Sequence, residues 1–135
     1  MIEHTFSFIK ADAVERELVD EIIKRIENAG LKIIEQKRVM LDKEKLETIY
    51  REHLEKDFFP EHARILLSGE SVVMLIEGED AISRMRKLVG ATDPKKAERG
   101  TIRGDLAPDV FHNVIHAADS RESFERESAL FFPKP

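Results

Sequence analysis

The stretch TFSFIKADAVERELVDEIIKRIENAGLKII, residues 5–34, decides the fold because it carries the signals of a strand, a helix and a second strand in that order. Residues 5–9 are rich in aromatic and β-branched side chains, which predicts a first strand. Between residues 14 and 28, apolar residues recur at helical spacing, and Gly30 follows where a helix should stop. Residues 31–41 then predict a second strand.

The middle of the chain continues this order. Its patterns predict a helix, a short helix, an apolar strand and a further helix, over residues 43–54, 61–68, 71–78 and 79–89. Asp42 is placed to cap the first of these helices, and Gly90 ends the last.

The last third of the chain is less regular. Residues 90–113 show no clear periodicity, which predicts a long loop of the kind that often carries function. Residues 114–118 are expected to form a short extended piece. Ser120 opens a helix over residues 120–128, and residues 129–132, ALFF, predict a last strand.

Strand, helix and strand therefore occur twice, which is the split βαβ, or ferredoxin-like, plan. We expect an α+β protein with a four-stranded antiparallel sheet, helices on one face and a long loop before the segment around His116. With 135 residues and no internal repeat, one domain over residues 1–135 is expected.

Composition excludes several classes of function. The chain has no cysteine, so disulfides, thiolate metal sites and a cysteine nucleophile are ruled out. A net charge of −5 disfavours nucleic acid as a partner. The start MIEHTFSFIK lacks the pattern of a signal peptide, and no apolar run is long enough for a membrane span. A cytoplasmic protein without a membrane partner is expected.

Two histidines stand four residues apart in FHNVIHAADS, residues 111–120. His116 lies beside polar side chains and apolar neighbours, which favours a catalytic role, although an isolated histidine is more often structural. His112 and His116 could instead bind a transition metal with Asp119, but the segment would then have to be helical.

Other residues suggest a phosphate site. Lys10 ends the first strand, Arg86 lies on the helix before the loop, and Arg103 stands in TIRGD, where glycine and threonine suit a guanidinium grip on phosphate. In DFFPEH, residues 57–62, two adjacent phenylalanines cannot both face one core, so Phe58 could expose a ring for a base.

The chain resembles the nucleoside diphosphate kinases over most of its length. The resemblance is carried by TFSFIKADAVERELVDEIIKRIENAGLKI, FFPEH, SGESVVMLIEGEDAI, RKLVGATDPKKAERGTIRGD and NVIHAADS, the last similar to the family signature N-x-x-H-G-S-D-S. The resemblance implies transfer of the γ-phosphate between nucleotides by a ping-pong mechanism, with a phosphohistidine on His116 and broad base specificity. It also implies Mg²⁺ as cofactor, and a homo-oligomer, a hexamer or tetramer built from dimers.

The resemblance further implies a role for each matching residue. His116 would be the catalytic nucleophile and His112 a neighbour, with Glu127 orienting His116 and Asp119 near the magnesium. Phe58 would stack on the base and Asn113 would bind the ribose hydroxyl. The remaining nucleotide-binding residues would contact the phosphates: Lys10, Tyr50, Arg86, Thr92 and Arg103.

The chain also departs from the family pattern. Ala117 and Ala118 replace the glycine and serine of the signature, Ala11 replaces a proline after Lys10, and Phe111 stands near the expected base slot. These changes leave two other readings open: a nucleotide-binding module that has lost transfer, and a metal-dependent hydrolase that uses both histidines.

Overall fold

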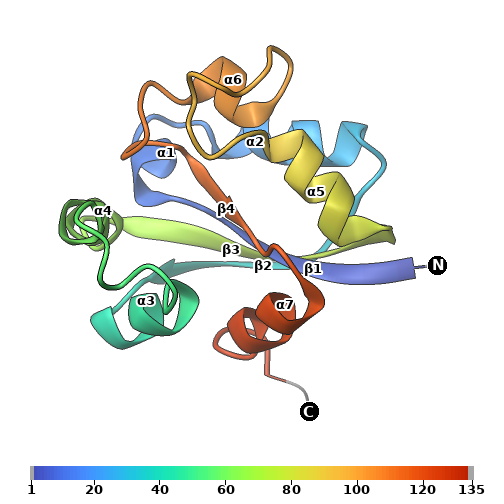
Figure 1. Cartoon of the computed structure of the whole chain (residues 1–135). Helices are drawn as coiled ribbons and strands as arrows, with labels where there is room; N and C mark the ends of the chain where they lie inside the picture. Colours follow the sequence, from blue (N-terminus) through green and yellow to red (C-terminus); the bar gives the residue numbers. More distant parts are fainter. Residues whose placement is uncertain (1, 134–135) are drawn as a thin grey trace.

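A computed structural model describes residues 2–133, and the remaining residues of the predicted domain, Met1, Lys134 and Pro135, lie outside the described part. Four strands form one antiparallel sheet in the order β2-β3-β1-β4 (Figure 1). Their bounds are β1 (Ile2–Ile9), β2 (Lys32–Met40), β3 (Glu70–Glu79) and β4 (Ile115–Ala117). The ferredoxin-like class of fold is therefore confirmed.

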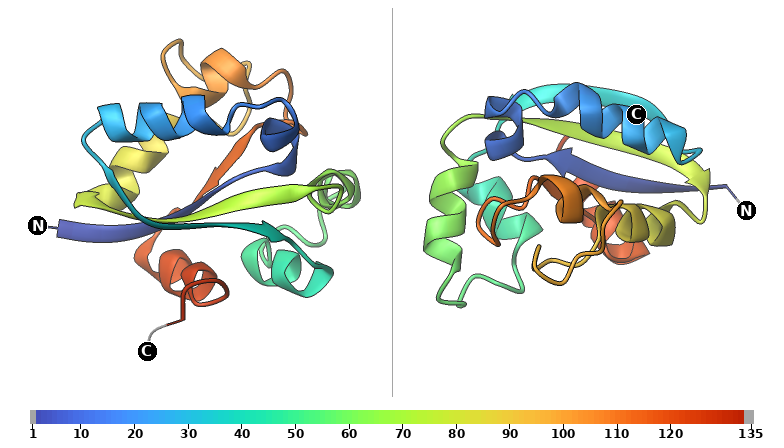
Figure 2. Two further views of the ribbon diagram at one scale, coloured as in Figure 1. Left: turned by 180° about the vertical axis from the view of Figure 1, so that it is seen from behind. Right: turned by 90° about the horizontal axis from the view of Figure 1, so that it is seen from above.

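Helices cover both faces of the sheet, so the expectation of helices on one face was wrong. One face carries α1 (Ala11–Glu15), α2 (Val19–Asn28), α5 (Ala81–Val89) and α6 (Ile102–Leu106) (Figures 1 and 2). The other carries α3 (Lys43–Ile49) and α7 (Arg121–Ser128), with α4 (Phe59–Leu66) at one end. None of these helices is long and apolar enough, within residues 2–133, to cross a bilayer.

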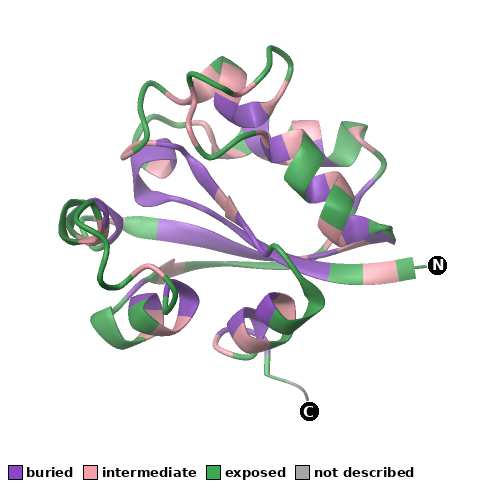
Figure 3. Ribbon diagram, viewed as in Figure 1, coloured by how far each residue is buried: buried purple, intermediate pink, exposed green. Residues whose placement is uncertain are grey.

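The two covered faces explain why most of β1 and β3 is buried, apart from the first residues of β1 and the ends of β3. Successive side chains of a strand point to opposite faces. On β1, Phe6 and Phe8 pack into the cluster under α3 and α7, while Ile9 packs into the cluster under α2 and α5. On β3, Met74 and Val73 divide between the same two clusters. Figure 3 shows the buried central parts of both strands and the exposed N-terminal end of β1.

The predicted last strand, residues 129–132, is wrong. Phe131 and Phe132 form turns after α7, and both of their backbone N–H groups donate to the carbonyl of Ser128, at 3.1 and 2.7 Å. Both rings are buried in the same hydrophobic cluster, whereas adjacent residues of a strand point to opposite faces of the sheet. The edge beside β1 is taken instead by β4, in which Ala117 pairs with Ser7.

Two helices are shorter than predicted. The segment 14–28 breaks into α1 and α2, because Glu17 has φ of +61° and cannot continue a helix. The apolar spacing runs on across the break, so the sequence pattern hides it. The helix predicted over residues 43–54 ends at Ile49, and turns follow up to Phe58.

The caps and stops follow the sequence closely. Asp42 and Ser120 are N-caps whose side chains accept from the backbone N–H groups of Lys45 and Ser123. Gly90 ends α5 with φ of +90°, a conformation that glycine adopts without strain.

The predicted long loop over residues 90–113 contains one helix, α6, which the periodicity did not reveal. Thr101 caps it by accepting from the backbone N–H of Gly104 at 3.0 Å. The backbone is tightly packed there: a Cβ on Gly104 would lie 2.0 Å from the carbonyl oxygen of Glu98. Gly104 thereby allows the compact turn that sets the position of its neighbour Arg103.

We predict that Gly104→Ala lowers the free energy of unfolding by about 2 kcal/mol, because the clash is with backbone and the turn must shift. Gly69→Ala is the matched control, since a Cβ there would meet the Cβ of Ala11 at 3.8 Å, an ordinary contact. The control should change stability by less than about 1 kcal/mol. Urea denaturation measures both, and equal midpoints for the two variants would contradict the packing argument.

Candidate active site

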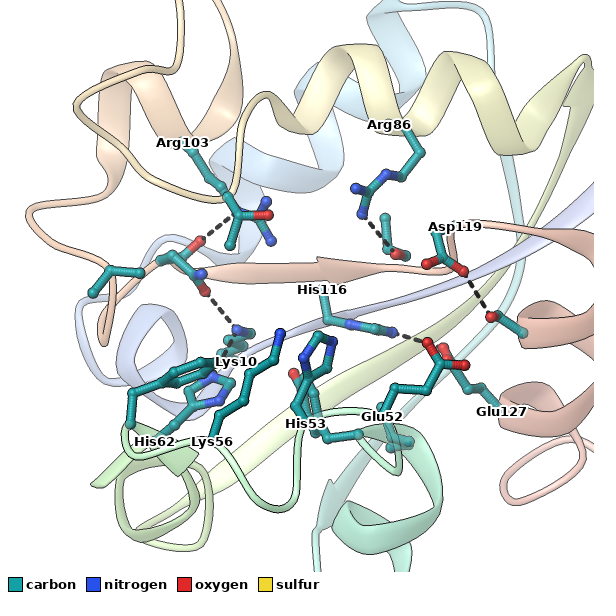
Figure 4. Close-up of a pocket in the computed structure, with 18 of the residues that line it drawn as sticks. Lys10, Glu52, His53, Lys56, His62, Arg86, Arg103, His116, Asp119 and Glu127 are labelled. Carbon is teal, nitrogen blue, oxygen red and sulfur yellow. Dashed lines mark hydrogen bonds and ion pairs between the residues drawn. The ribbon is translucent and has the colours of Figure 1, made fainter. Parts of the chain in front are cut away.

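A cleft of about 440 Å³ opens beside β4. Its walls come from the end of β1, the α3–α4 region, α5, the long loop and α7 (Figure 4). All ten residues singled out from the sequence line it, although they are spread over 118 positions of the chain: Lys10, Tyr50, Phe58, Arg86, Thr92, Arg103, Asn113, His116, Asp119 and Glu127.

His116 stands in the middle of β4, with a side chain that is 15% exposed. Its Nε2 lies 2.6 Å from Oε1 of Glu127 on α7. A carboxylate only accepts hydrogen bonds, so Nε2 carries the proton and donates, and Nδ1 keeps a free lone pair. Burial lowers the pKa of His116, and the hydrogen bond with Glu127 acts against that shift. The ring is therefore neutral at pH 7, and its free lone pair is on Nδ1.

Two aromatic rings pack against the imidazole of His116. The ring of Phe8, the partner of His116 across β1 and β4, stacks on it with centroids 5.1 Å apart. The ring of Tyr50 meets it edge-on at 5.4 Å. Together with Glu127, these contacts restrict the ring to one orientation.

The backbone just before β4 is strained. Val114 has φ of +63°, which is an outlier for a β-branched residue, and the N–H of Ile115 donates to the carbonyl of Asn113 at 2.8 Å. This tight γ-turn lets the Asn113 side chain point into the cleft two residues before the strand begins. The carbonyl of Val114 accepts from the N–H of Lys10, which ties the turn to the end of β1.

Arg103 holds that turn from the other side. Its guanidinium donates to three carbonyl oxygens, those of Asn113 at 3.3 Å, Gly90 at 3.3 Å and Ile115 at 2.6 Å. A guanidinium has five N–H donors, so two remain for a ligand. The side chain is buried, which lowers the pKa of Arg103 to about 10 and still leaves it charged at pH 7.

Lys10 is the most deeply placed cation of the cleft, with 2% of its surface exposed. Its Nζ donates to Oδ1 of Asn113 at 2.5 Å and lies 3.0 Å from Nε2 of His62. Burial, and then the positive charge of Arg103, lower the pKa of Lys10 well below its usual value. An anionic ligand that neutralises these charges would therefore be bound strongly.

The outer part of the cleft carries exposed groups. Arg86 on α5 donates to the carbonyl of Ala117 at 3.2 Å, and Thr92 lies in the loop that follows α5. Asp119 accepts from the hydroxyl of Ser123 at 2.7 Å, and this bond lowers the pKa of Asp119. A cation and an anion therefore flank the mouth of the cleft near His116.

Two aromatic residues line the opposite side. Tyr50 is buried, its hydroxyl has no hydrogen-bond partner within residues 2–133, and burial raises its pKa. Phe58 precedes α4 and is 39% exposed, while its neighbour Phe59 packs against the core under α3. One ring of the pair is thus open to the cleft, as the adjacent phenylalanines suggested.

Sequence reasoning missed several residues of the cleft. His53, Lys56 and His62 line it on the side of α4, and Ser123 and Arg126 line it on α7. A signal for His62 was present: in FFPEH it stands four residues after Phe58, which places the two on one side of a helix. His53 and Lys56 lie in the turns after α3, for which the sequence carried no clear signal.

The metal pair of His112 and His116 does not form. Residues 115–117 are a strand, not a helix, and His112 lies outside the cleft with its ring bonded to Asp109 at 2.8 Å. Within residues 2–133 no cluster of three or more metal-ligating side chains occurs.

The departures from the family pattern leave the site geometry in place. Ala117 and Ala118 are fully buried, and the contact between His116 and Glu127 forms without a serine hydroxyl. Val110, and not Phe111, lines the cleft at the expected base slot.

Comparison with known proteins gives one consistent result. The sequence profile described as Nucleoside diphosphate kinase matches residues 3–135. A nucleoside diphosphate kinase of Methanocaldococcus jannaschii is 49% identical over 132 residues, which cover 98% of this chain and 94% of that one. One from Sulfurisphaera tokodaii is 50% identical over 131 residues, covering 97% and 89%.

Solved structures agree with the sequence relatives. A halophilic nucleoside diphosphate kinase from Halobacterium salinarum, in complex with CDP, superposes with a TM-score of 0.94 at 41% identity, covering 99% of this chain and 90% of that one. The apo enzyme from Encephalitozoon cuniculi gives a TM-score of 0.94 at 40% identity, covering 98% and 90%. With the profile match over nearly its whole length, this chain belongs to the nucleoside diphosphate kinase family, a family of phosphotransferases.

Proposed function

We propose that the chain moves the γ-phosphate of a nucleoside triphosphate to a nucleoside diphosphate in two steps, through a phosphohistidine at Nδ1 of His116. The single observation that carries this proposal is the bond from Nε2 to Glu127, which leaves Nδ1 as the free nitrogen in a cleft lined by Lys10, Arg86 and Arg103. In the first step, Nδ1 attacks the γ-phosphorus and the diphosphate leaves. In the second, an acceptor diphosphate attacks the same phosphorus and Nδ1 is released.

Histidine suits a relay of this kind for two reasons. The overall transfer is nearly thermoneutral, so the intermediate must hold the phosphoryl group loosely, as an N–P bond to imidazole does. A neutral imidazole also needs no separate base, unlike serine or lysine. The lowered pKa of His116 supports the neutral form at pH 7.

Positive charge around the ring supplies the electrostatic part of catalysis. Negative charge spreads over the phosphoryl oxygens in the transition state, so fixed cations close to them lower the barrier. We assign this role to Lys10, Arg86 and the two free N–H groups of Arg103. Tyr50 and Thr92 contribute hydroxyl groups, and Asn113 binds the ribose hydroxyl.

The exposed ring of Phe58 supports broad base specificity. A base that stacks on an aromatic ring is held through its π-face, which every nucleobase has. The base would lie at the mouth of the cleft, between Phe58 and the loop that carries Val110. The complex of the related Halobacterium salinarum enzyme with CDP is consistent with a nucleotide in this cleft.

Magnesium fits this site as an ion carried by the nucleotide. Mg²⁺ takes oxygen ligands and keeps most of its waters, so one nearby carboxylate and the substrate phosphates suffice. Asp119, ionised and at the mouth of the cleft, is the residue that would face it. When bound, the ion neutralises phosphate charge during transfer.

Association and location stay predictions. A homo-oligomer, a hexamer or tetramer built from dimers, is supported by exposed apolar side chains on the edge strand β2, such as Ile34 and Met40. A cytoplasmic location rests on the resemblance and on the composition alone.

Radiolabelling tests the covalent step. Incubation with γ-labelled ATP and Mg²⁺ should give a phosphoprotein that is labile in acid and stable in alkali, and any nucleoside diphosphate should remove the label. His116→Ala should abolish labelling, because His116 is the imidazole of the cleft that is hydrogen-bonded to Glu127 and therefore has a free Nδ1. His112→Ala is the matched control and should keep it, since His112 lies outside the cleft. Label that survives His116→Ala would sink the proposal.

Glu127→Gln tests the role of Glu127 in the hydrogen bond with His116. The ring gains positive charge as Nδ1 forms its bond to phosphorus, and a carboxylate stabilises that charge about 1.4 kcal/mol better than an amide, so kcat should fall about tenfold. Loss of the negative charge also lowers the pKa of His116 further, because Glu127 acts to raise it. The acid limb of activity, where the ring becomes protonated, should therefore move to lower pH.

Ring NMR of His116 against pH, together with steady-state rates, measures both effects of Glu127→Gln. Conservative removal of a surface carboxylate, Glu125→Gln on the exposed side of α7, is the control and should change neither. An acid limb that moves to higher pH in Glu127→Gln would show that the carboxylate does not support the ring as proposed.

Chelation tests the metal. Activity should be lost when EDTA exceeds Mg²⁺ and should return when Mg²⁺ is restored, because the phosphate charge is then neutralised again. Circular dichroism should not change, since residues 2–133 contain no cluster of metal ligands that a resident ion would hold together. Full activity without divalent ions would overturn this part of the proposal.

A further inference from the structure

His62 is a buried histidine that the proposed mechanism does not use. It lies on α4 with 5% of its surface exposed and lines the same cleft as His116. Its Nε2 is 3.0 Å from Nζ of Lys10. Its other nitrogen, Nδ1, is buried and has no hydrogen-bond partner within residues 2–133. Figure 4 shows the ring of His62 directly beside the end of the Lys10 side chain.

The contact with Lys10 determines the chemical form of His62. Burial and the charge of Lys10 lower the pKa of His62 to about 2, so the ring is neutral under all ordinary conditions. A neutral imidazole that faces an ammonium group offers it the lone pair of Nε2 and keeps its own proton on Nδ1. The proton on Nδ1 is then the buried group without a partner, which is a cost that a leucine at this position would not carry.

The contact also determines the environment of Lys10. An ammonium group has three N–H donors, and two of them point to Asn113 and His62. The ring of Tyr50 lies 5.8 Å from the same nitrogen. The two acceptors come from different segments, so they fix the direction of the ammonium group as well as its protonation.

Charged groups around Lys10 act in both directions. Arg103 on α6 lowers the pKa of Lys10, and the carboxylate of Asp12 on α1 raises it. Asp12 is itself buried, which raises its own pKa and disfavours its charged form. His116 and Tyr50 also face the site, but both are neutral at pH 7. A neutral acceptor at position 62 therefore matters for keeping the lysine charged.

We infer that His62 is a positioning residue: its Nε2 accepts a hydrogen bond from the ammonium group of Lys10 and holds that group charged and aimed at the phosphates of the nucleotide. The inference rests on the proposed function for its effect on catalysis. Its effect on Lys10 itself can be measured in the free protein.

The test compares His62→Leu, which removes the acceptor, with His62→Gln, whose side-chain oxygen can take the place of Nε2. Lysine labelled with ¹³C at Cε reports the pKa of Lys10 by NMR, with Lys10→Arg to assign the signal. A hydrogen bond to a charged group corresponds to about one pKa unit or more, so His62→Leu should lower the pKa of Lys10 by about one unit. His62→Gln should restore most of that shift.

Kinetics should follow the same order. Lys10 with a lower pKa loses its proton at lower pH, so the alkaline limb of kcat/KM should move down by about one unit in His62→Leu and much less in His62→Gln. His4→Leu, at the opposite end of β1, is the control and should move neither quantity. If circular dichroism shows that the His62→Leu variant does not fold, His62→Met, which also lacks an acceptor nitrogen, takes its place.

Two results would overturn the inference. One is a pKa of Lys10 that is the same in His62→Leu as in the unsubstituted chain. The other is an equal shift of the Lys10 pKa and of the alkaline limb of kcat/KM in His62→Leu and His62→Gln. Equal shifts would mean that His62 acts through packing alone. A chain that forms no phosphohistidine would defeat the proposed function instead, and the NMR titration would still decide between the two views of His62.

Discussion

The hydrogen bond between His116 and Glu127 determines which nitrogen of the histidine is available to react, and most of the site is arranged around that bond. Glu127 lies on α7, which covers one face of the sheet, while His116 lies on β4 at its edge. The bond therefore joins two elements and depends on both being packed correctly. The turn that replaces the expected last strand serves this packing, because Phe131 and Phe132 anchor the end of α7 in the core.

A second constraint acts on the backbone before β4. The strained turn at Val114 persists because Arg103 binds carbonyls on both sides of it and Lys10 binds the carbonyl of Val114 itself. The same arginine and lysine face the cleft. The guanidinium of Arg103 thus holds the backbone and supplies positive charge, so a change at Arg103 would alter geometry and electrostatics together. Lys10 ties the turn through its backbone N–H and supplies charge through its side chain.

The sequence predicted the parts of the protein that depend on local rules. Strands β1 and β3, the caps at Asp42 and Ser120 and the stop at Gly90 follow from side-chain pattern and backbone preference. The break at Glu17 and helix α6 leave no mark in the apolar periodicity, and the assignment of the fourth strand depends on a contact between distant segments. The choice between β4 and residues 129–132 is an example: both are apolar, and only pairing with β1 separates them.

The site shows the same division. Residue chemistry alone pointed to His116, Lys10, Arg86, Arg103 and Phe58 as candidates. The motif resemblance was needed to join them with Glu127 in one site, since spacing could not bring Lys10 and Glu127 together. His62 was missed because its importance lies in one contact with a lysine 52 positions away. A contact between residues so far apart leaves no periodic pattern in the sequence, although FFPEH places His62 on the same side of α4 as Phe58.

The buried cations of the cleft, Lys10 and Arg103, are hydrogen-bonded to neutral partners, and this affects how the cleft binds an anion. A carboxylate in contact with Lys10 would stabilise its charge better than Asn113 and His62 do, but it would also neutralise the lysine and compete with phosphate. Neutral acceptors orient the ammonium group, and its positive charge remains available to bind phosphate. Because the positive charge of Arg103 lowers the pKa of Lys10, an anion between them relieves repulsion as it binds. Protonation of Lys10 and binding of a polyphosphate are therefore coupled, and each strengthens the other to the same extent.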